Sequence, residues 1–206
     1  MTTSTDLPQV APWRRVVVLA RPGAGKSTQA GRLARRLGVD HLSSGAMIRS
    51  EVASSSGLGR TVAPLVERGE LVPDELVLAV IVPALGRAVA DHGGYVLDGF
   101  PRDVVQATTL AGLGSPASGS PASSPEVVLW LDVGADECRH RLLARAGVGG
   151  RSDDSALTVE RRLVAYERVT APVLAYYERG GKVVVIDGVG TPEEVEHRVA
   201  DALGAA

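Results

Sequence analysis

Residues 16–28 read VVVLARPGAGKST, an apolar run followed by a glycine-rich loop and a lysine. The pattern predicts a buried strand, a tight loop and the start of a helix, where backbone N–H groups and the helix dipole attract an anion. Lys26 is placed to reach the β- and γ-phosphates of a nucleotide, and the Ser27 hydroxyl can bind Mg²⁺. Among 22 basic residues only Lys26 and Lys182 are lysines, so a compact ammonium is kept where a guanidinium would serve less well.

Length, charge and cysteine content narrow the class of protein. A chain of 206 residues fits one domain, 1–206. The net charge of −2 provides no basic field for nucleic acid. Cys138 is the only cysteine, which excludes an intrachain disulfide and favours a reducing, cytoplasmic compartment. No apolar run is long enough for a membrane span or a signal core, and the four scattered histidines have no zinc-ligand spacing.

Short apolar runs alternate with helical patterns, which predicts an α/β fold with a parallel sheet covered on both faces. The expected strands are Val16–Ala20, Asp40–Ser43, Tyr95–Asp98, Val127–Asp132 and Lys182–Asp187. The expected helices are Lys26–Leu37, Gly45–Ser54, Gly59–Arg68, Asp74–Asp91, Val104–Leu113, Asp136–Ala146, Ser155–Arg179 and Pro192–Leu203. Pro172 should kink or break the long helix, and Thr191 with Glu194 should form a capping box.

Three segments do not look like core. The leader 1–12 and the Pro/Ala/Ser-rich stretch 114–125 cannot bury enough apolar surface, so both are expected to be flexible. The glycine-rich residues 146–150 have the permissive backbone of a lid.

A second cluster of charged residues follows the third expected strand. Asp98 ends that strand, where a carboxylate can hold Mg²⁺ or its waters, and Arg102 can bind a second anion. Many arginines suit phosphoryl transfer, in which positioning and charge stabilisation dominate catalysis. The candidates are Arg49, Arg102, Arg141, Arg145, Arg151 and Arg162, although the sequence alone does not show that they converge.

These motifs together match one family. From Arg15 to Leu203 the chain closely resembles the adenylate kinases, in the short-lid form of the nucleoside monophosphate kinases. The matching stretches are RPGAGKSTQ (21–29), HLSSG (41–45) with Arg49, GELVPD (69–74), DGFPR (98–102) with Gln106, Arg145 with GRSDD (150–154), and Arg162 with Tyr166 and TAP (170–172).

The resemblance implies a fold and a reaction. The fold would be a P-loop three-layer α/β/α domain with a five-stranded parallel sheet, a helical NMP-binding insertion at 43–72 and a short lid at 145–154. The reaction would be Mg·ATP + AMP ⇌ 2 ADP, with Mg²⁺ as the metal. The lid carries no cysteine, so the zinc-bearing lid of some relatives is excluded. Short-lid relatives suggest a monomer.

The resemblance also implies site residues. ATP would be bound by Gly23, Ala24, Gly25, Lys26, Ser27, Thr28, Arg141, Arg145 and Gly190, the last near the adenine. AMP would be bound by Ser44, Arg49, Glu70, Leu71, Val72, Gly99, Phe100, Pro101, Arg102, Gln106, Arg151 and Arg162. Gln106 would read the adenine of AMP, since an amide can pair with adenine in a bidentate way. Lys26, Arg102, Arg145, Arg151 and Arg162 would be catalytic, and Ser27 and Asp98 would hold the metal directly or through water.

Three positions depart from the family pattern. Ala20 replaces the first glycine of the phosphate loop, and Ser27 replaces a second glycine. Ala46 stands where the family usually has an aspartate that is thought to order the waters of Mg²⁺. We therefore expect an active enzyme whose rate or metal affinity these departures could lower.

Three alternatives remain open. One is a kinase for UMP or CMP, against which Gln106 argues. Another is a nucleotide-binding paralogue with weakened catalysis, suggested by Ala20 and Ala46 but opposed by Lys26 and Arg102. A P-loop GTPase or DNA-dependent ATPase is the weakest, because the chain lacks an Asn-Lys-x-Asp pattern and its near-neutral charge balance disfavours a nucleic-acid surface.

Overall fold

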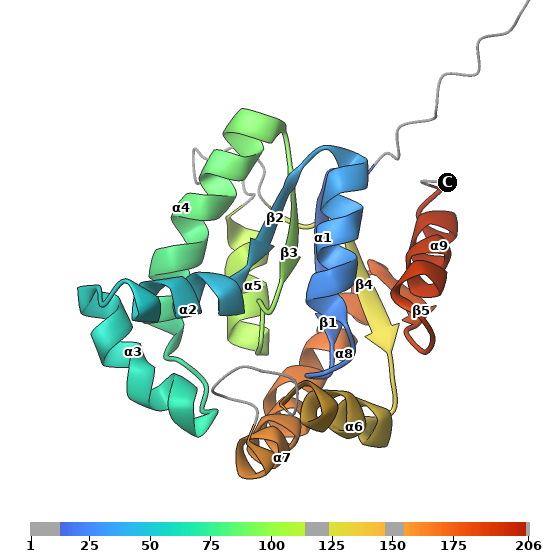
Figure 1. Ribbon diagram of the computed structural model, residues 1–206. Coiled ribbons are helices and arrows are strands. Elements are labelled where there is room, and N and C mark those ends of the chain that lie inside the picture. Colours follow the sequence, from blue (N-terminus) through green and yellow to red (C-terminus); the bar gives the residue numbers. More distant parts are fainter. Residues whose placement is uncertain (1–12, 114–123, 147–154, 205–206) are drawn as a thin grey trace, which may run out of the picture.

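The computed structural model describes residues 13–113, 124–146 and 155–204. The expectations for 1–12, for most of 114–125 and for nearly all of the lid 145–154 lie outside the described residues. The described chain forms one five-stranded parallel sheet with strand order β2-β3-β1-β4-β5 (Figure 1). The strands are β1 (Arg15–Ala20), β2 (Asp40–Ser43), β3 (Tyr95–Asp98), β4 (Val127–Asp132) and β5 (Val183–Asp187).

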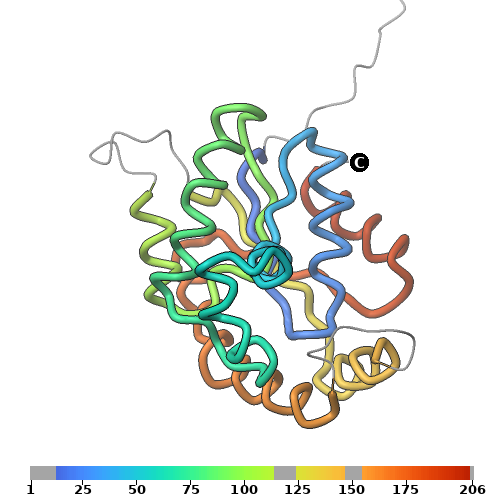
Figure 2. Tube along the Cα trace, turned by 60° about the vertical axis from the view of Figure 1, so that its left-hand side comes forward, coloured from blue at the N-terminus to red at the C-terminus, as the bar shows by residue number. Residues whose placement is uncertain are grey.

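Helices cover both faces of the sheet, as the continuous apolar strands predict. They are α1 (Lys26–Leu37), α2 (Ser44–Ala53), α3 (Gly57–Arg68), α4 (Asp74–His92), α5 (Val104–Gly112), α6 (Ala135–Ala146), α7 (Ala156–Ala165), α8 (Ala171–Arg179) and α9 (Pro192–Ala202). A π-helical turn, Tyr166–Thr170, joins α7 to α8. Figures 1 and 2 show α1 and α9 side by side on one face, with α4 and α5 towards the other. The predicted α/β/α fold is confirmed.

Central strand β1 divides the core into two layers. Val16 and Val18 pack in the cluster that includes α1, α6 and α9, whereas Val17 and Leu19 pack in the cluster that includes α4, α5 and α8. Successive side chains of a strand point to opposite faces, so an apolar run with both faces buried needs no polar alternation.

The order of the strands also positions the site. β1 pairs with β3 on one side and with β4 on the other, and all pairs are parallel. The carboxyl ends of β1 and β3 therefore lie at one edge, where the strand order reverses and where α/β sheets bind ligands. Residues 21–25 and 99–103 leave the sheet at that edge.

Several predicted element bounds are wrong by one or two residues. Helix α3 begins at Gly57 rather than Gly59 because the Ser56 hydroxyl accepts a hydrogen bond from the Gly59 N–H and caps the helix. Lys182 lies outside β5, and its Nζ donates to the carbonyl of Pro125 at 2.8 Å. The predicted capping box of Thr191 and Glu194 is confirmed.

The predicted long helix Ser155–Arg179 is interrupted before Pro172, as expected. Proline lacks an N–H and its ring crowds the carbonyl four residues earlier, so α8 begins at Ala171 with Pro172 in its first turn. The π-helical turn before it carries Tyr166 and Thr170, whose side chains are buried.

Helices α2 and α3, within the expected insertion 43–72, project from the body beside β2 and α4 (Figure 1). Gly59 allows their close approach, because a Cβ there would lie 1.9 Å from the carbonyl oxygen of Glu51. Across residues 13–113, 124–146 and 155–204, no helix combines the length and apolar character that a membrane span needs.

Candidate active site

The phosphate loop turns tightly from β1 into α1. Gly23 and Gly25 have φ values of +89° and +88°, in the left-handed region that favours glycine. A Cβ on Gly23 would lie 2.5 Å from the carbonyl oxygen of Cys138, so the loop packs directly against α6. Arg21 anchors the loop by donating from Nε to Glu167 and from Nη1 to the carbonyl of Val133. The N-terminus of α1 is thereby directed at the edge of the sheet where ligands bind.

Lys26 lies among other charged groups of the site. Its pKa is lowered to about 8, chiefly by desolvation and with a smaller contribution from the positive charges of Arg102 and Arg162, while the charge of Asp98 opposes the shift. Two cations from separate segments thus act on the Lys26 ammonium. An anionic phosphate bound among them would raise the pKa of Lys26 again, because it stabilises the charged form.

Asp98 is held as a carboxylate at the end of β3. It is 2 % exposed; burial by itself would raise its pKa, but the hydrogen bond with His41 and the charge of Lys26 outweigh burial and lower it. The Ser27 hydroxyl donates to its Oδ1 at 2.9 Å, and His41 Nε2 lies 2.6 Å from its Oδ2.

The pair Ser27–Asp98 fits Mg²⁺. A hydroxyl and an ionised carboxylate are the oxygen ligands that Mg²⁺ prefers, and this ion usually keeps several waters. Within the described ranges, no group of three or more His, Cys, Asp or Glu side chains comes close enough to hold a metal.

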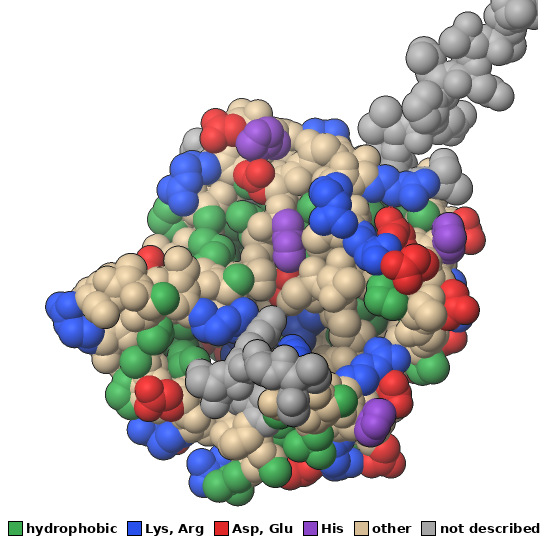
Figure 3. Space-filling model, viewed as in Figure 1, with side chains coloured by type: hydrophobic (Ala, Val, Ile, Leu, Met, Phe, Trp, Pro, Cys, Tyr) green, Lys and Arg blue, Asp and Glu red, His purple; other side chains and the backbone are tan. Residues whose placement is uncertain are grey.

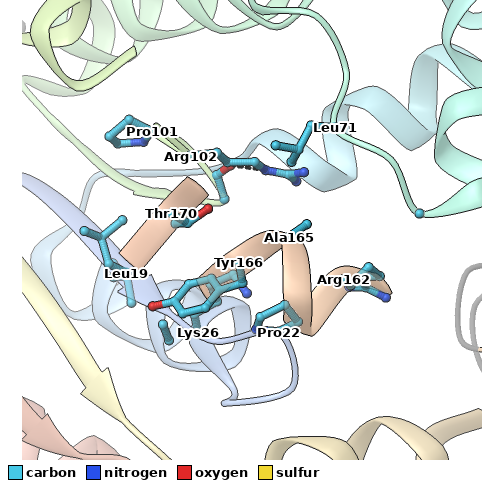
Figure 4. A pocket seen from close by; sticks show the side chains of 14 residues that line it. Leu19, Pro22, Lys26, Leu71, Pro101, Arg102, Arg162, Ala165, Tyr166 and Thr170 are labelled. Carbon is cyan, nitrogen blue, oxygen red and sulfur yellow. Dashed lines mark hydrogen bonds between the residues drawn. The ribbon is translucent and has the colours of Figure 1, made fainter. Parts of the chain in front are cut away.

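Two adjoining cavities open at this edge. The first holds about 600 Å³ of empty space, including its mouth, between the phosphate loop and the π-helical turn (Figure 4). The second holds about 740 Å³ between α2, α3, α4 and α5. Residues that line both are Gly69, Leu71, Arg102 and Arg162.

The two cavities meet at their basic residues. Arg102 and Lys26 face the first cavity from opposite sides (Figure 4). Arg49 lines the second cavity with Arg102 and Arg162. Basic side chains gather in the hollow beside the α2–α3 projection (Figure 3). An anion that reaches from one cavity into the other would therefore lie among cations.

Buried hydroxyls line both cavities. Among the residues that the structure describes, the Ser44 and Tyr166 hydroxyls are buried with no hydrogen-bond partner. Gly99, with φ of +76°, lets the loop after β3 approach Ser44 closely, since a Cβ there would lie 2.5 Å from Ser44 Oγ. An unpaired buried hydroxyl costs free energy, so a ligand that hydrogen-bonds to Ser44 would be favoured.

Comparison with known proteins identifies the family. The family model described as "Adenylate kinase" matches residues 18–182. The chain belongs to the adenylate kinase family. The adenylate kinase of Xanthomonas campestris pv. campestris is 42 % identical over 190 residues, which cover 92 % of this chain and 99 % of that protein. The adenylate kinase of Thermus thermophilus is 44 % identical over 189 residues, 92 % of this chain and 96 % of the relative. The family consists of nucleoside monophosphate kinases, which are phosphotransferases.

Most acceptor residues suggested by the adenylate kinase resemblance lie together. Those that line the second cavity are Ser44, Arg49, Glu70, Leu71, Val72, Arg102, Gln106 and Arg162. Gly99 and Pro101 line the first cavity. Phe100 is fully buried in the core, so its side chain supports the loop and lines neither cavity. Arg151 lies outside the described residues.

The suggested donor residues are more dispersed. Gly23 to Thr28 form the loop and the first turn of α1. Arg141 pairs with Glu137, and its Nη1 lies 3.4 Å from the carbonyl oxygen of Gly188, which brings α6 near the loop of Gly190. Arg145 lies in the last turn of α6.

Sequence reasoning assigned no role to several residues that the structure brings into the site. Asp74 lines the second cavity, and Tyr166 and Thr170 line the first. All three lie in stretches that resemble the adenylate kinases, and that position was the only available signal. The histidine spacing indicates no zinc site and gives His41 no other role. The contact of His41 with Asp98 follows from the parallel register that pairs Ser43 with Asp98.

Proposed function

We propose that this chain catalyses Mg·ATP + AMP ⇌ 2 ADP, with ATP on the phosphate loop and AMP in the second cavity. The observation that carries the proposal is that the two cavities meet at Arg102 and Arg162. A donor and an acceptor phosphate placed in them would come together among positive charges. Phosphoryl transfer needs this arrangement because it depends on positioning and on stabilising charge.

On the donor side, the backbone of Gly23 to Thr28 would hold the phosphates and the Lys26 ammonium would contact the β/γ oxygens. Ser27 and Asp98 would hold Mg²⁺, which neutralises phosphate charge when bound. Arg145 would reach ATP from the end of α6, with Arg141 and Gly190 towards the adenine.

On the acceptor side, Gln106 and Ser44 would bind AMP, and Arg49 and Arg102 would hold its phosphate. An oxygen of that phosphate attacks the γ-phosphorus, forming one P–O bond as the bond to the β-phosphate oxygen breaks. The electron pair of the broken bond leaves with ADP, so no covalent enzyme intermediate is needed. Arg102 and Arg162, together with Arg151 on the family pattern, would stabilise the transferring group.

We further propose that the enzyme acts as a monomer in the cytoplasm. Support comes from the single cysteine, which suits a reducing compartment, and from the short-lid resemblance. Burial raises the pKa of the Cys138 thiol, which disfavours the reactive thiolate.

The deciding experiment measures ADP formation from Mg·ATP with AMP, UMP, CMP, GMP or no acceptor in separate reactions. We expect fast ADP formation with AMP alone. Activity with UMP or CMP would show that the acceptor is a pyrimidine monophosphate, in contrast to the adenylate kinases named above. Binding of ATP and AMP without ADP formation would identify a weakened paralogue.

A further inference from the structure

The amide of Gln106 is held at both ends. Gln106 lies in the first turn of α5 and is 3 % exposed, at the wall of the second cavity. Its Nε2 donates to Asp74 Oδ1 at 2.6 Å, and its Oε1 accepts from the backbone N–H of Arg102 at 2.8 Å. Asp74 begins α4, so the amide links the start of α5 and the loop before it to a helix 32 positions earlier in the sequence.

Both partners permit only one orientation of this amide. A backbone N–H only donates hydrogen bonds, and a carboxylate only accepts them. Turning the amide over would place its NH₂ against the Arg102 N–H and its oxygen against the Asp74 carboxylate. Two repulsive contacts would replace two hydrogen bonds. The positions of the nitrogen and oxygen are thus determined by the partners.

The orientation of the amide matters because its oxygen and its nitrogen can each form one further hydrogen bond. An amide oxygen accepts two hydrogen bonds and an amide nitrogen donates two, so one position on each atom remains beyond these contacts. A 6-aminopurine carries a donor at C6 and an acceptor at the neighbouring ring nitrogen. A 6-oxopurine carries the reverse pair, an acceptor at C6 and a donor on the ring. The two purines therefore require opposite orientations of the same amide.

The apolar walls of the cavity suit a planar base but do not tell these purines apart. Its apolar walls include Ile48, Val66, Val72 and Val77, which contact a ring without reading its polar edge. Discrimination at C6 then depends on the amide. A buried polar group left unpaired by the wrong base is a strong source of specificity.

We propose that Asp74 is a positioning residue that makes the acceptor site select a 6-aminopurine monophosphate over a 6-oxopurine monophosphate, by holding the amide of Gln106 in one orientation. The inference rests on the proposed function, which places the acceptor base at Gln106. It assigns Asp74 no contact with the reacting atoms.

The test compares AMP with inosine 5′-monophosphate as acceptors, measuring kcat and KM separately. In Asp74→Ala we expect the ratio of kcat/KM for AMP over inosine monophosphate to fall roughly tenfold, the scale of a bidentate amide–base contact. The change should lie in the acceptor KM, with kcat for AMP and the KM for ATP nearly unchanged. Asp74→Asn should keep most of the ratio, because its side-chain oxygen can accept the same hydrogen bond.

Glu75→Ala is the matched control. Glu75 is the next residue in the first turn of α4, is exposed and carries the same charge, so its removal alters the helix terminus equally. Its ratio should equal that of the wild type. If Asp74→Ala does not fold, Asp74→Ser, whose hydroxyl is too short to reach Gln106, serves the same purpose.

A double-mutant cycle separates positioning from direct contact with the base. In a Gln106→Ala background, removing Asp74 should change the ratio no further. An additive effect would overturn the inference, as would an unchanged ratio in Asp74→Ala while the wild type forms ADP from AMP. Failure of the wild type to use AMP at all would instead overturn the proposed function.

Discussion

The phosphate loop takes its anion-binding groups from one short stretch, Gly23 to Thr28, whereas the acceptor cavity is lined from α2, α3, α4, α5 and α7. The loop relies on backbone N–H groups and one helix terminus, which any sequence with the right glycines can present. The cavity relies on side chains whose positions depend on how five helices pack. Donor binding is therefore local, and acceptor recognition is a property of the tertiary structure.

This contrast predicts different consequences of mutation on the two sides. A change in the loop removes a phosphate contact directly. A change far along the chain can alter the acceptor cavity, because its walls belong to separate elements. The following experiments test that difference, beginning with the largest expected effect.

Lys26→Ala and Arg102→Ala should each lower kcat/KM by roughly 10²–10³-fold, because each removes charge stabilisation of the transferring phosphoryl group. Lys26→Ala should also weaken ATP binding, whereas Arg102→Ala should weaken AMP binding. Steady-state kinetics with each substrate varied in turn measures both. Nearly normal activity in Arg102→Ala would show that AMP does not bind where we place it.

ATP binding should weaken above pH 8, because the free site holds the pKa of Lys26 at about 8 and bound phosphate raises it. Binding then takes up a proton, so above pH 8 the Kd should rise by up to about tenfold per pH unit. Below pH 8 Lys26 is charged in the free and in the ATP-bound site, so it should not change the Kd for ATP with pH. Calorimetry from pH 6.5 to 9.5 measures this, and Lys26→Arg, which does not titrate, should lack the rise.

Gly59→Ala should destabilise the protein by about 1–3 kcal/mol, because its Cβ would lie 1.9 Å from the Glu51 carbonyl oxygen between α2 and α3. We expect a higher KM for AMP with the KM for ATP unchanged. Gly86→Ala in α4 is the control, since a Cβ there meets nothing within 4 Å and the exposed helix should gain up to about 1 kcal/mol. Thermal unfolding measures the stability of the two variants, and steady-state kinetics measures their KM values for AMP and ATP. An equal rise of the two KM values in Gly59→Ala would contradict separate acceptor and donor sites.

Ala46→Asp should have the smallest effect, a rise of roughly a few-fold in kcat or in Mg²⁺ affinity, since Mg²⁺ prefers carboxylate oxygens. Ala46 is exposed in the first turn of α2, where an added carboxylate should also stabilise the helix by about 0.3–1 kcal/mol. A magnesium titration of initial rates measures the first effect. If rate and affinity both stay constant, Ala46 does not limit catalysis.

Much of the fold could be predicted from the sequence because its signals are local. The apolar runs predicted all five strands within one residue, and Pro172 predicted the interruption between α7 and α8. Element ends were predicted less well, because a cap such as Ser56 at α3 is one of several polar residues near the helix start. In the site, the phosphate loop was evident as a motif and Arg102 was a candidate anion ligand, whereas the division of the arginines between ATP and AMP came from the family resemblance.

The sequence by itself determined the parallel sheet, the phosphate loop and the kind of chemistry, because strand burial, glycine geometry and helix dipoles act over a few neighbouring residues. Only the tertiary structure decided that Arg102 and Arg162 both lie where the two cavities join, and that Asp74 holds Gln106. The two members of these pairs are 60 and 32 positions apart in the sequence. Their partners are selected by the packing of helices on the sheet, which no local pattern specifies.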